Sequence, residues 1–402
     1  MQAEVNIGML GHVDHGKTSI TQCLTGKWTD THSEEIKRGI SIRIGYADVV
    51  LKKCPKCLEP GCYTREEKCP KCGSKAEPLR TISILDAPGH ETLMTTAIAA
   101  SSIMDGALLV IAANEECPQP QTLEHLTVLE VLGVKNIVVV QNKVDLVPRE
   151  KALENYNQIK KFLKGSVAEN APIIPFVANK CANVDALMEA IHKHMPTPQR
   201  KLDASPKMYV ARSFDINKPG TEISKLSGGV IGGSLIEGVL KIGDEVELRP
   251  GIMVGEKGKE EKARPLKVIV ERLFAGNEKL TEAHPGGLIA VGTSLDPSIT
   301  KSDRIVGNLL GKPGDMPPVS NELNLEFHFL KRVDLENAAL KPKEPLVLSI
   351  GTATAIGFVE GMKKNVVRLM LKRPICVMIG SKLAVSRRIN SRWRLSGYGT
   401  VK

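Results

Sequence analysis

Hydrophobic and polar positions follow two different spacings along this chain. Between Val5 and His194, short apolar runs such as Val5–Leu10 alternate with segments whose apolar residues recur at helical spacing, as in Asn183–His194. The runs predict buried strands, and the segments predict amphipathic helices. Because strands and helices alternate, we expect an α/β domain with a mostly parallel sheet covered by helices.

The second half of the chain has a different pattern. Short runs rich in Val, Ile and Leu alternate there with glycine turns, as in Ser227–Ser234 and Val239–Leu248. This pattern predicts antiparallel β-barrels, and a break at Gly311–Gly314 separates two such stretches. We therefore expect one α/β domain and two antiparallel β-barrel domains, at residues 1–202, 203–320 and 321–402.

The segment Gly11–Thr18 carries the first chemical signal. It reads Gly, four residues, Gly-Lys-Thr and follows an apolar run, which predicts a phosphate loop at a strand-to-helix turn. Backbone N–H groups at the start of such a helix suit phosphates, Lys17 can reach the outer two phosphates, and the Thr18 hydroxyl can ligate magnesium. We expect the following residues to contact the phosphates or their magnesium: Asp14, His15, Gly16, Lys17, Thr18 and Ser19.

A second motif, Asp86-Ala-Pro-Gly89-His90, follows another strand-like run, Thr81–Asp86. The carboxyl ends of parallel strands meet at one edge of a sheet, so the Asp86 carboxylate is expected beside the metal. The backbone N–H of Gly89 can then bind the terminal phosphate.

A third motif, Asn142-Lys143-Val-Asp145, follows the run Asn136–Gln141 and therefore belongs to the same edge. The Asp145 carboxylate can accept hydrogen bonds from two N–H groups of guanine, which adenine does not offer. A simple turn after a strand is the alternative for this tetrapeptide alone. The three motifs in this order favour guanine-nucleotide binding.

Four of the nine cysteines form two Cys-x-x-Cys pairs with eleven residues between them: Cys54, Cys57, Cys69 and Cys72. This spacing predicts a zinc knuckle at 54–72, in which four thiolates hold a structural ion. Unliganded thiols in a surface loop are the alternative, and Cys62 could replace one ligand. The other cysteines are scattered and expected to be buried apolar side chains: Cys23, Cys117, Cys181 and Cys376.

Net charge and amino-acid composition limit the classes of partner that this chain can bind. The net charge of +10 favours a polyanion, while the aromatic content of 3% argues against binding of single strands by stacking. Arg387–Arg394 contains four arginines around Trp393, which suits either phosphate binding or a barrel strand with one solvated face. No leader or membrane-spanning apolar run is recognisable, so we expect a cytoplasmic location without a membrane partner.

The phosphate loop and the phrase Arg38-Gly-Ile-Ser-Ile42 resemble the translational GTPases of the elongation-factor-Tu type. Within that group, the knuckle, Lys37–Tyr46 and Arg212–Gly220 resemble the gamma subunits of archaeal and eukaryotic translation initiation factor 2. The resemblance implies a GTP-binding domain followed by two β-barrels. It also implies delivery of methionyl initiator tRNA to the small ribosomal subunit with mRNA, in a heterotrimer with alpha and beta subunits.

The resemblance also assigns roles to single residues. His90 would orient the attacking water, and the Ala178 N–H of the weaker motif Val177-Ala178-Asn179 would bind the guanine oxygen. No arginine finger is recognisable, so slow intrinsic GTP hydrolysis is expected. The magnesium ion would be associated with the following residues, the last of them through water: Asp14, Thr18, Gly39, Ser41 and Asp86.

Two other functions fit the same motifs. One is an elongation-type or selenocysteine-specific carrier of aminoacyl-tRNA, and the other is a GTP-dependent assembly protein that binds no tRNA. Tyr46, which follows the first switch, could contact the acylated end of a tRNA or simply pack inside the protein.

Overall fold

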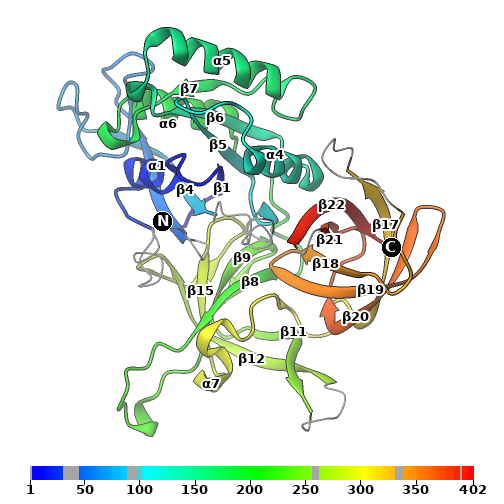
Figure 1. Ribbon diagram of the computed structural model, residues 1–402. Helices are drawn as coiled ribbons and strands as arrows, with labels where there is room; N and C mark the ends of the chain where they lie inside the picture. The colour runs from blue at the N-terminus through cyan, green and yellow to red at the C-terminus, as the bar shows by residue number, and fades with distance from the viewer. Residues whose placement is uncertain are drawn as a thin grey trace. The chain divides into compact units, whose positions relative to one another are not determined.

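The computed structural model describes residues 2–29, 45–87, 98, 101–255, 262–330, 339–389 and 392–402. The chain forms two compact units, which meet in sequence between Gln199 and Arg200. The first unit combines helices with a sheet, and the described part of the second consists almost entirely of strands (Figure 1).

A seven-stranded sheet forms the centre of the first unit, in the order β3-β2-β4-β1-β5-β6-β7. Its strands are β1 (Val5–Gly11), β2 (Gly45–Lys53), β3 (Tyr63–Thr64), β4 (Glu77–Asp86), β5 (Gly106–Ala112), β6 (Asn136–Asn142) and β7 (Ile173–Pro175). The pairs β4–β1, β1–β5, β5–β6 and β6–β7 are parallel, whereas β2 and β3 add an antiparallel edge. The predicted, mostly parallel sheet is therefore confirmed.

Helices connect these strands, and the helix predicted from apolar spacing at Asn183–His194 is present as α6 (Val184–His194). A second helix, α4 (Pro120–Leu132), lies between β5 and β6. The first unit also contains α1 (Lys17–Thr25), α5 (Arg149–Leu163) and the 3-10 turns η2 (Val144–Leu146) and η3 (Ala178–Lys180).

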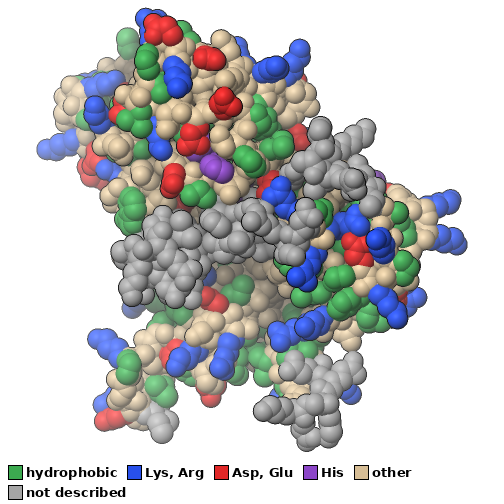
Figure 2. Space-filling view, viewed as in Figure 1, with side chains coloured by type: hydrophobic (Ala, Val, Ile, Leu, Met, Phe, Trp, Pro, Cys, Tyr) green, Lys and Arg blue, Asp and Glu red, His purple; other side chains and the backbone are tan. Residues whose placement is uncertain are grey.

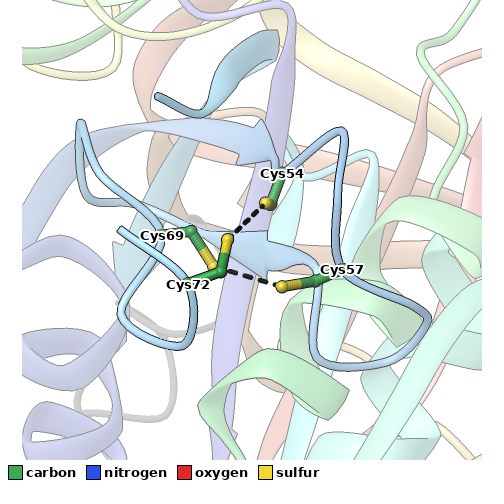
Figure 3. A group of neighbouring side chains, drawn as sticks. All are labelled: Cys54, Cys57, Cys69 and Cys72. Carbon is green, nitrogen blue, oxygen red and sulfur yellow. Dashed lines mark hydrogen bonds between the residues drawn. The ribbon is translucent and has the colours of Figure 1, made fainter. Parts of the chain in front are cut away.

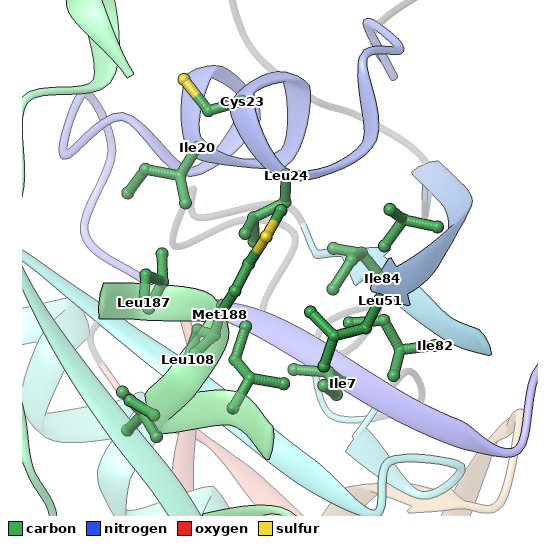
Figure 4. Packing of buried hydrophobic residues seen from close by; sticks show 14 of the residues in the cluster. Ile7, Ile20, Cys23, Leu24, Leu51, Ile82, Ile84, Leu108, Leu187 and Met188 are labelled. Carbon is green, nitrogen blue, oxygen red and sulfur yellow. The ribbon is translucent and has the colours of Figure 1, made fainter. Parts of the chain in front are cut away.

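Buried side chains fix α1 and α6 on the sheet. Ile20 and Leu24 from α1 and Leu187 from α6 pack against Ile7 of β1 and its neighbouring strands (Figure 4). All four are fully buried, and burial of an aliphatic side chain of this size contributes about 1.5–3 kcal/mol. The apolar face of each helix therefore determines where the loops at its ends lie.

Six strands close the first barrel of the second unit, in the order β11-β16-β8-β9-β15-β12 with β12 paired back to β11. They are β8 (Lys207–Phe214), β9 (Val230–Glu237), β11 (Glu245–Val254), β12 (Lys262–Ala275), β15 (Ile289–Thr293) and β16 (Leu309–Gly311). The smaller elements are β10 (Leu240–Lys241), β13 (Glu278–Leu280), β14 (Glu282–Ala283), η4 (Ile223–Lys225), α7 (Pro297–Thr300) and η5 (Lys301–Asp303). All pairings in this ring are antiparallel, as predicted.

The second barrel is a closed antiparallel ring in the order β17-β20-β19-β18-β21-β22. Its strands are β17 (Val319–Phe329), β18 (Pro345–Ile350), β19 (Ala353–Lys363), β20 (Val366–Cys376), β21 (Lys382–Ile389) and β22 (Arg392–Val401). Each barrel has its own apolar core. No helix among the described residues is long and apolar enough to cross a membrane.

Polar contacts join the two barrels within this unit. The Thr352 hydroxyl, between β18 and β19, donates to the Val210 carbonyl oxygen at 2.7 Å. Arg249 of β11 donates to the carbonyl oxygens of Met316 and Pro317 at 3.1 and 2.9 Å, on the segment that leads into β17.

The buried imidazole of His125 predicts sensitivity of the first unit to acid. Burial in α4 lowers the pKa of His125 to about 3, and the charge of Lys17 adds to this effect. The unfolded chain binds a proton near pH 6.5, so the free energy of unfolding should fall by about 1.6 kcal/mol between pH 6.5 and 5 from this group alone. A His125→Gln variant should lose that part of the pH dependence.

Urea denaturation at both pH values measures this effect. Fluorescence of Trp28 in a Trp393→Phe background reports on the first unit, and His284→Gln at an exposed position of the second unit is the matched control. An equal pH dependence in His125→Gln and the parent protein would contradict the prediction.

Candidate functional site

Two glycines shape the loop between β1 and α1. Gly11 and Gly16 have φ angles of 139° and 93°. A Cβ atom would lie 2.3 Å from the Val110 carbonyl oxygen at Gly11 and 2.3 Å from Asn142 Nδ2 at Gly16. Both positions therefore require glycine. Gly16 is also the N-cap of α1, and it has no side chain that could accept hydrogen bonds from the first N–H groups of this helix. These N–H groups can instead bind an anion such as phosphate.

Lys17 and Thr18 begin α1, and both lie against the loop or the sheet edge. Lys17 Nζ donates to the carbonyl oxygens of Gly11 and His12 at 3.0 and 2.7 Å. The Thr18 hydroxyl donates to Asp86 Oδ2 at 2.8 Å. The structure thus brings together two of the side chains expected near magnesium, at the ends of β1 and β4. Hydroxyl and carboxylate oxygens are the hard ligands that magnesium prefers, so this pair fits the ion.

Thr29 also contacts this carboxylate, which sequence reasoning missed. Its hydroxyl donates to Asp86 Oδ2 at 2.7 Å. No motif marks Thr29, and the contact arises only because the chain after α1 returns to the end of β4.

Glu115 is a second residue that the sequence did not reveal. It lies 3.3 Å from His15 Nε2, while His15 Nδ1 lies 3.0 Å from the Val110 carbonyl oxygen. His15 is fully buried, and burial lowers its pKa. Since both ring nitrogens face groups inside the domain, a phosphate contact of His15 would come from its backbone.

Asn142 connects the phosphate loop to the turn after β7. Its Nδ2 donates to the His15 carbonyl oxygen at 2.8 Å, and its Oδ1 accepts from the Ala178 N–H at 3.1 Å. The side chain is buried at the end of β6. The Ala178 N–H is therefore already engaged, and a guanine oxygen would share this donor with Asn142.

The remaining residues of the guanine motifs lie at the ends of β6 and β7. Lys143 has a left-handed backbone with a φ angle of 63°, after which Asp145 is exposed in η2. Val177 is the N-cap of η3, which contains the exposed Asn179. An exposed carboxylate at this edge is accessible to a base bound there.

The described residues cover only part of the predicted site. Asp14 is exposed with a φ angle of 61°, and Ser19 is half-buried on α1. The other predicted positions lie outside the described residues: Gly39, Ser41, Gly89 and His90.

The four cysteines of the predicted knuckle converge (Figure 3). Their sulfur atoms all lie within 4.8 Å of one another, with 3.4 Å between Cys54 and Cys72 and 3.6 Å between Cys57 and Cys69. A tetrahedral zinc site with Zn–S bonds of about 2.3 Å places its sulfurs about 3.8 Å apart, so the cluster fits zinc after small shifts. Hydrogen bonds from Ser74 lower the pKa of Cys72 to about 6, which favours the thiolate form.

Cys62 is not part of this cluster, although it is buried nearby and its carbonyl oxygen accepts from the Cys54 N–H at 2.7 Å. The expectation for Cys23 and Cys181 was wrong, because these residues form a disulfide. They are 158 positions apart, and only the packing of α1 beside η3 brings them together. Cys117 and Cys376 are partly buried, and burial raises their pKa values to about 12 and about 11.

The arginine-rich segment is mainly a pair of barrel strands, β21 and β22. Arg387 is buried and donates to both carboxylate oxygens of Glu344, at 2.7 and 3.0 Å, so it is not available to a phosphate. Arg388 is exposed and Arg394 is half-buried, whereas the Arg392 side chain lies outside the described residues.

Exposed cations also gather on β19, β20 and the turn between them, and Figure 2 shows Lys and Arg side chains on this barrel. These exposed cations are Lys363, Lys364, Arg368, Lys372 and Arg373. The sequence did not reveal them, because charged residues that alternate along a strand do not by themselves indicate a ligand site.

Comparison with known proteins agrees with this geometry. Residues 2–197 match the family model of the elongation factor Tu GTP binding domain, and residues 321–401 match that of the C-terminal domain of initiation factor eIF2 gamma. Translation initiation factor 2 subunit gamma from Methanocaldococcus jannaschii is 56% identical over 406 residues, which cover 100% of this chain and 98% of that protein. The Pyrococcus abyssi subunit is 54% identical with the same coverage.

Solved structures of similar fold include a bacterial selenocysteine-specific elongation factor EF-Sec, with a TM-score of 0.76 and 27% identity. This chain is covered completely in that match and spans 58% of the EF-Sec chain. The elongation factor SelB from Methanococcus maripaludis, in complex with a GTP analogue, has a TM-score of 0.74 and 22% identity, with 100% of this chain and 79% of that chain covered. The likeness to SelB supports the fold alone. The full-length similarity to the initiation-factor subunits shows that this chain belongs to the gamma-subunit family of translation initiation factor 2, a family of translational GTPases.

Proposed function

We propose that this chain is the GTP-binding subunit of a heterotrimeric translation initiation factor 2. In its GTP state it binds methionyl initiator tRNA and delivers it to the small ribosomal subunit with mRNA, and GTP hydrolysis leads to release. The main support is similarity to gamma subunits over the whole chain, including a C-terminal barrel of the same family. Elongation-type and selenocysteine-specific carriers share the fold at much lower identity.

The geometry of the sheet edge supports the proposed nucleotide contacts. The N–H groups at the start of α1 and Lys17 bind the phosphates, while Asp145 accepts from the guanine N–H groups. Val177, Ala178 and Asn179 complete the base site, with Asn142 holding this turn beside the phosphate loop.

Thr18 and Asp86 would hold magnesium together with Asp14, Gly39 and Ser41. When bound, this ion would supply positive charge that neutralises the negative charge developing during transfer. His90 would orient the attacking water. Since catalysis of this kind depends on positioning and charge stabilisation, the chain without an arginine finger should hydrolyse GTP slowly.

Cys54, Cys57, Cys69 and Cys72 would hold a structural zinc ion. Four thiolates close the coordination sphere, so no position is left for a substrate. The ion would keep the excursion between β2 and β4 folded.

The heterotrimer would contain alpha and beta subunits and work in the cytoplasm without a membrane partner. Domain limits at 1–202, 203–320 and 321–402 would match the three-domain architecture of this family. The exposed cations of β19, β20 and Arg388 would contribute phosphate contacts to RNA.

Binding of aminoacylated tRNA tests the proposed function. The GTP-loaded chain, with and without alpha and beta subunits, should bind methionyl initiator tRNA in preference to an elongator aminoacyl-tRNA. Equal affinity in a filter-binding assay would indicate an elongation role instead, and no binding in any combination would favour an assembly GTPase. GDP-loaded protein is the control for nucleotide dependence.

Substitution of Asp145 tests the base site. Asp145→Asn removes one acceptor and the charge, so affinity for GTP should fall by about 10- to 150-fold, the usual loss for a hydrogen bond to a charged group. Competition against a fluorescent GDP analogue measures this loss. Affinity for xanthosine triphosphate should rise instead, because xanthine carries an oxygen where guanine has an amine, and the amide introduced by Asp145→Asn can donate to that oxygen whereas a carboxylate cannot. Glu154→Gln, at an exposed position of α5, is the matched control. A similar loss in both variants would refute the assignment.

Zinc content tests the knuckle. Purified protein should contain one zinc ion per chain by inductively coupled plasma mass spectrometry. The zinc content of Cys72→Ser should fall well below one ion per chain, because three thiolates bind zinc more weakly than four. Cys62→Ala should retain the ion, since Cys62 lies outside the cluster. Zinc-free wild-type protein, or greater loss from Cys62→Ala than from Cys72→Ser, would contradict the prediction.

A further inference from the structure

The Cys23–Cys181 disulfide links the two halves of the nucleotide site. Cys23 lies on α1, the helix that begins with Lys17 and Thr18, and Cys181 follows η3 directly. The disulfide therefore ties the helix proposed to bind phosphates to the turn proposed to bind guanine.

A cavity of about 310 Å³ lies beside this disulfide, and both cysteines line it. Cys181 is exposed, whereas Cys23 is only 5% exposed, so a reagent that enters the cavity can reach Cys181 first. The volume lies at the lower end of the range for small-molecule sites. A cavity of this volume admits a compact metabolite.

The knuckle supplies the opposite wall and fixes it at two points. Arg65 donates to the Gln22 carbonyl oxygen of α1 at 3.2 Å, and Lys71 forms an ion pair with Asp185 of α6 at 3.0 Å.

The lining of the cavity carries charges of both signs. Its cations are Arg65 and Lys71, which pair with the carboxylates Glu66 and Asp185 at 2.9 and 3.0 Å. A small ligand with both a carboxylate and an ammonium group matches such a lining, because each of its charges can join one of these two ion pairs.

We propose that this cavity binds a low-molecular-weight thiol of that kind and that the thiol exchanges with the disulfide at Cys181. The thiolate attacks Cys181 Sγ and forms a new S–S bond, while the bond to Cys23 breaks and Cys23 Sγ leaves with the electron pair and takes up a proton. A second thiol attacks the mixed disulfide and releases Cys181 as a thiol. Two ligand thiols are thereby oxidised to one disulfide, and the protein disulfide is reduced to two thiols.

This exchange regulates nucleotide binding, a consequence that rests on the proposed function. Reduction removes the covalent link between η3 and α1 and leaves weaker contacts, such as the 3.0 Å approach of Cys23 Sγ to the Ala178 carbonyl oxygen and the bond from Ala178 to Asn142. The guanine turn then opens more often, and bound nucleotide leaves faster. Disulfides in cytosolic proteins are usually transient and redox-sensing, which agrees with such a role.

The test uses the full-length, zinc-loaded chain, oxidised or treated with free cysteine. Peptide mapping should find residues 23 and 181 cross-linked in the oxidised protein and a cysteine adduct on Cys181 during exchange. Dissociation of a fluorescent GDP analogue should be about fivefold or more faster after reduction, the lower range of common allosteric couplings. At equal thiolate concentration, the uncharged thiol 2-mercaptoethanol should exchange more slowly than cysteine.

Variants separate this effect from other thiol chemistry. Cys181→Ser should dissociate GDP at the fast rate in both states, whereas Cys117→Ser should behave like the wild type, because Cys117 does not line the cavity. Zinc content, measured in each sample, identifies any damage to the knuckle. Absence of the cross-link, or equal dissociation rates in both states, would overturn the proposal. Failure of both states to bind GDP would instead refute the proposed function, and the peptide map would still decide exchange at Cys181.

Discussion

The buried side chain of Asn142 is the contact on which the proposed nucleotide site depends. Its amide donates to the His15 carbonyl oxygen of the loop before α1 and accepts from the turn after β7, so one residue fixes the distance between these two segments. Loss of a buried hydrogen-bond partner of this kind lowers the free energy of unfolding by about 1–3 kcal/mol. Here it would also change the positions of both segments. The requirement for glycine at position 16 follows from the same contact, because Asn142 occupies the space of a Cβ.

Several further interactions hold α1 in the orientation that this contact needs. Its apolar face packs on the sheet, Arg65 of the knuckle contacts the Gln22 carbonyl oxygen, and Cys23 bonds to Cys181. Exposed ion pairs and hydrogen bonds of the knuckle contribute little to stability individually. Their effect is to orient a small excursion against the back of the nucleotide site, so a structural zinc ion there would support the switch without contacting nucleotide.

The closed geometry of the two barrels determines which charged side chains of the second unit are exposed and which are buried. Within each ring, closure pairs both edges of every strand, and side chains alternate between core and solvent. Arg387 is an exception, since it is buried and paired with Glu344, with the Phe329 ring 5.9 Å away. Exposed cations such as Arg373 and Arg388 can reach a polyanion, whereas exposed Arg368 pairs with both Glu322 and Glu360.

The sequence alone determined the order of the elements, the fold class and the residues of the local motifs, because loop chemistry and side-chain spacing are properties of neighbouring residues. Gly16, Lys17, Asn142 and the four knuckle cysteines belong to this group. Only the tertiary structure decided that Glu115 contacts His15, that Thr29 shares Asp86 with Thr18, that Cys23 bonds to Cys181 and that Arg387 is buried. These contacts join residues far apart in the chain. No local pattern marks them, since they exist only where separate helices, strands and turns pack together.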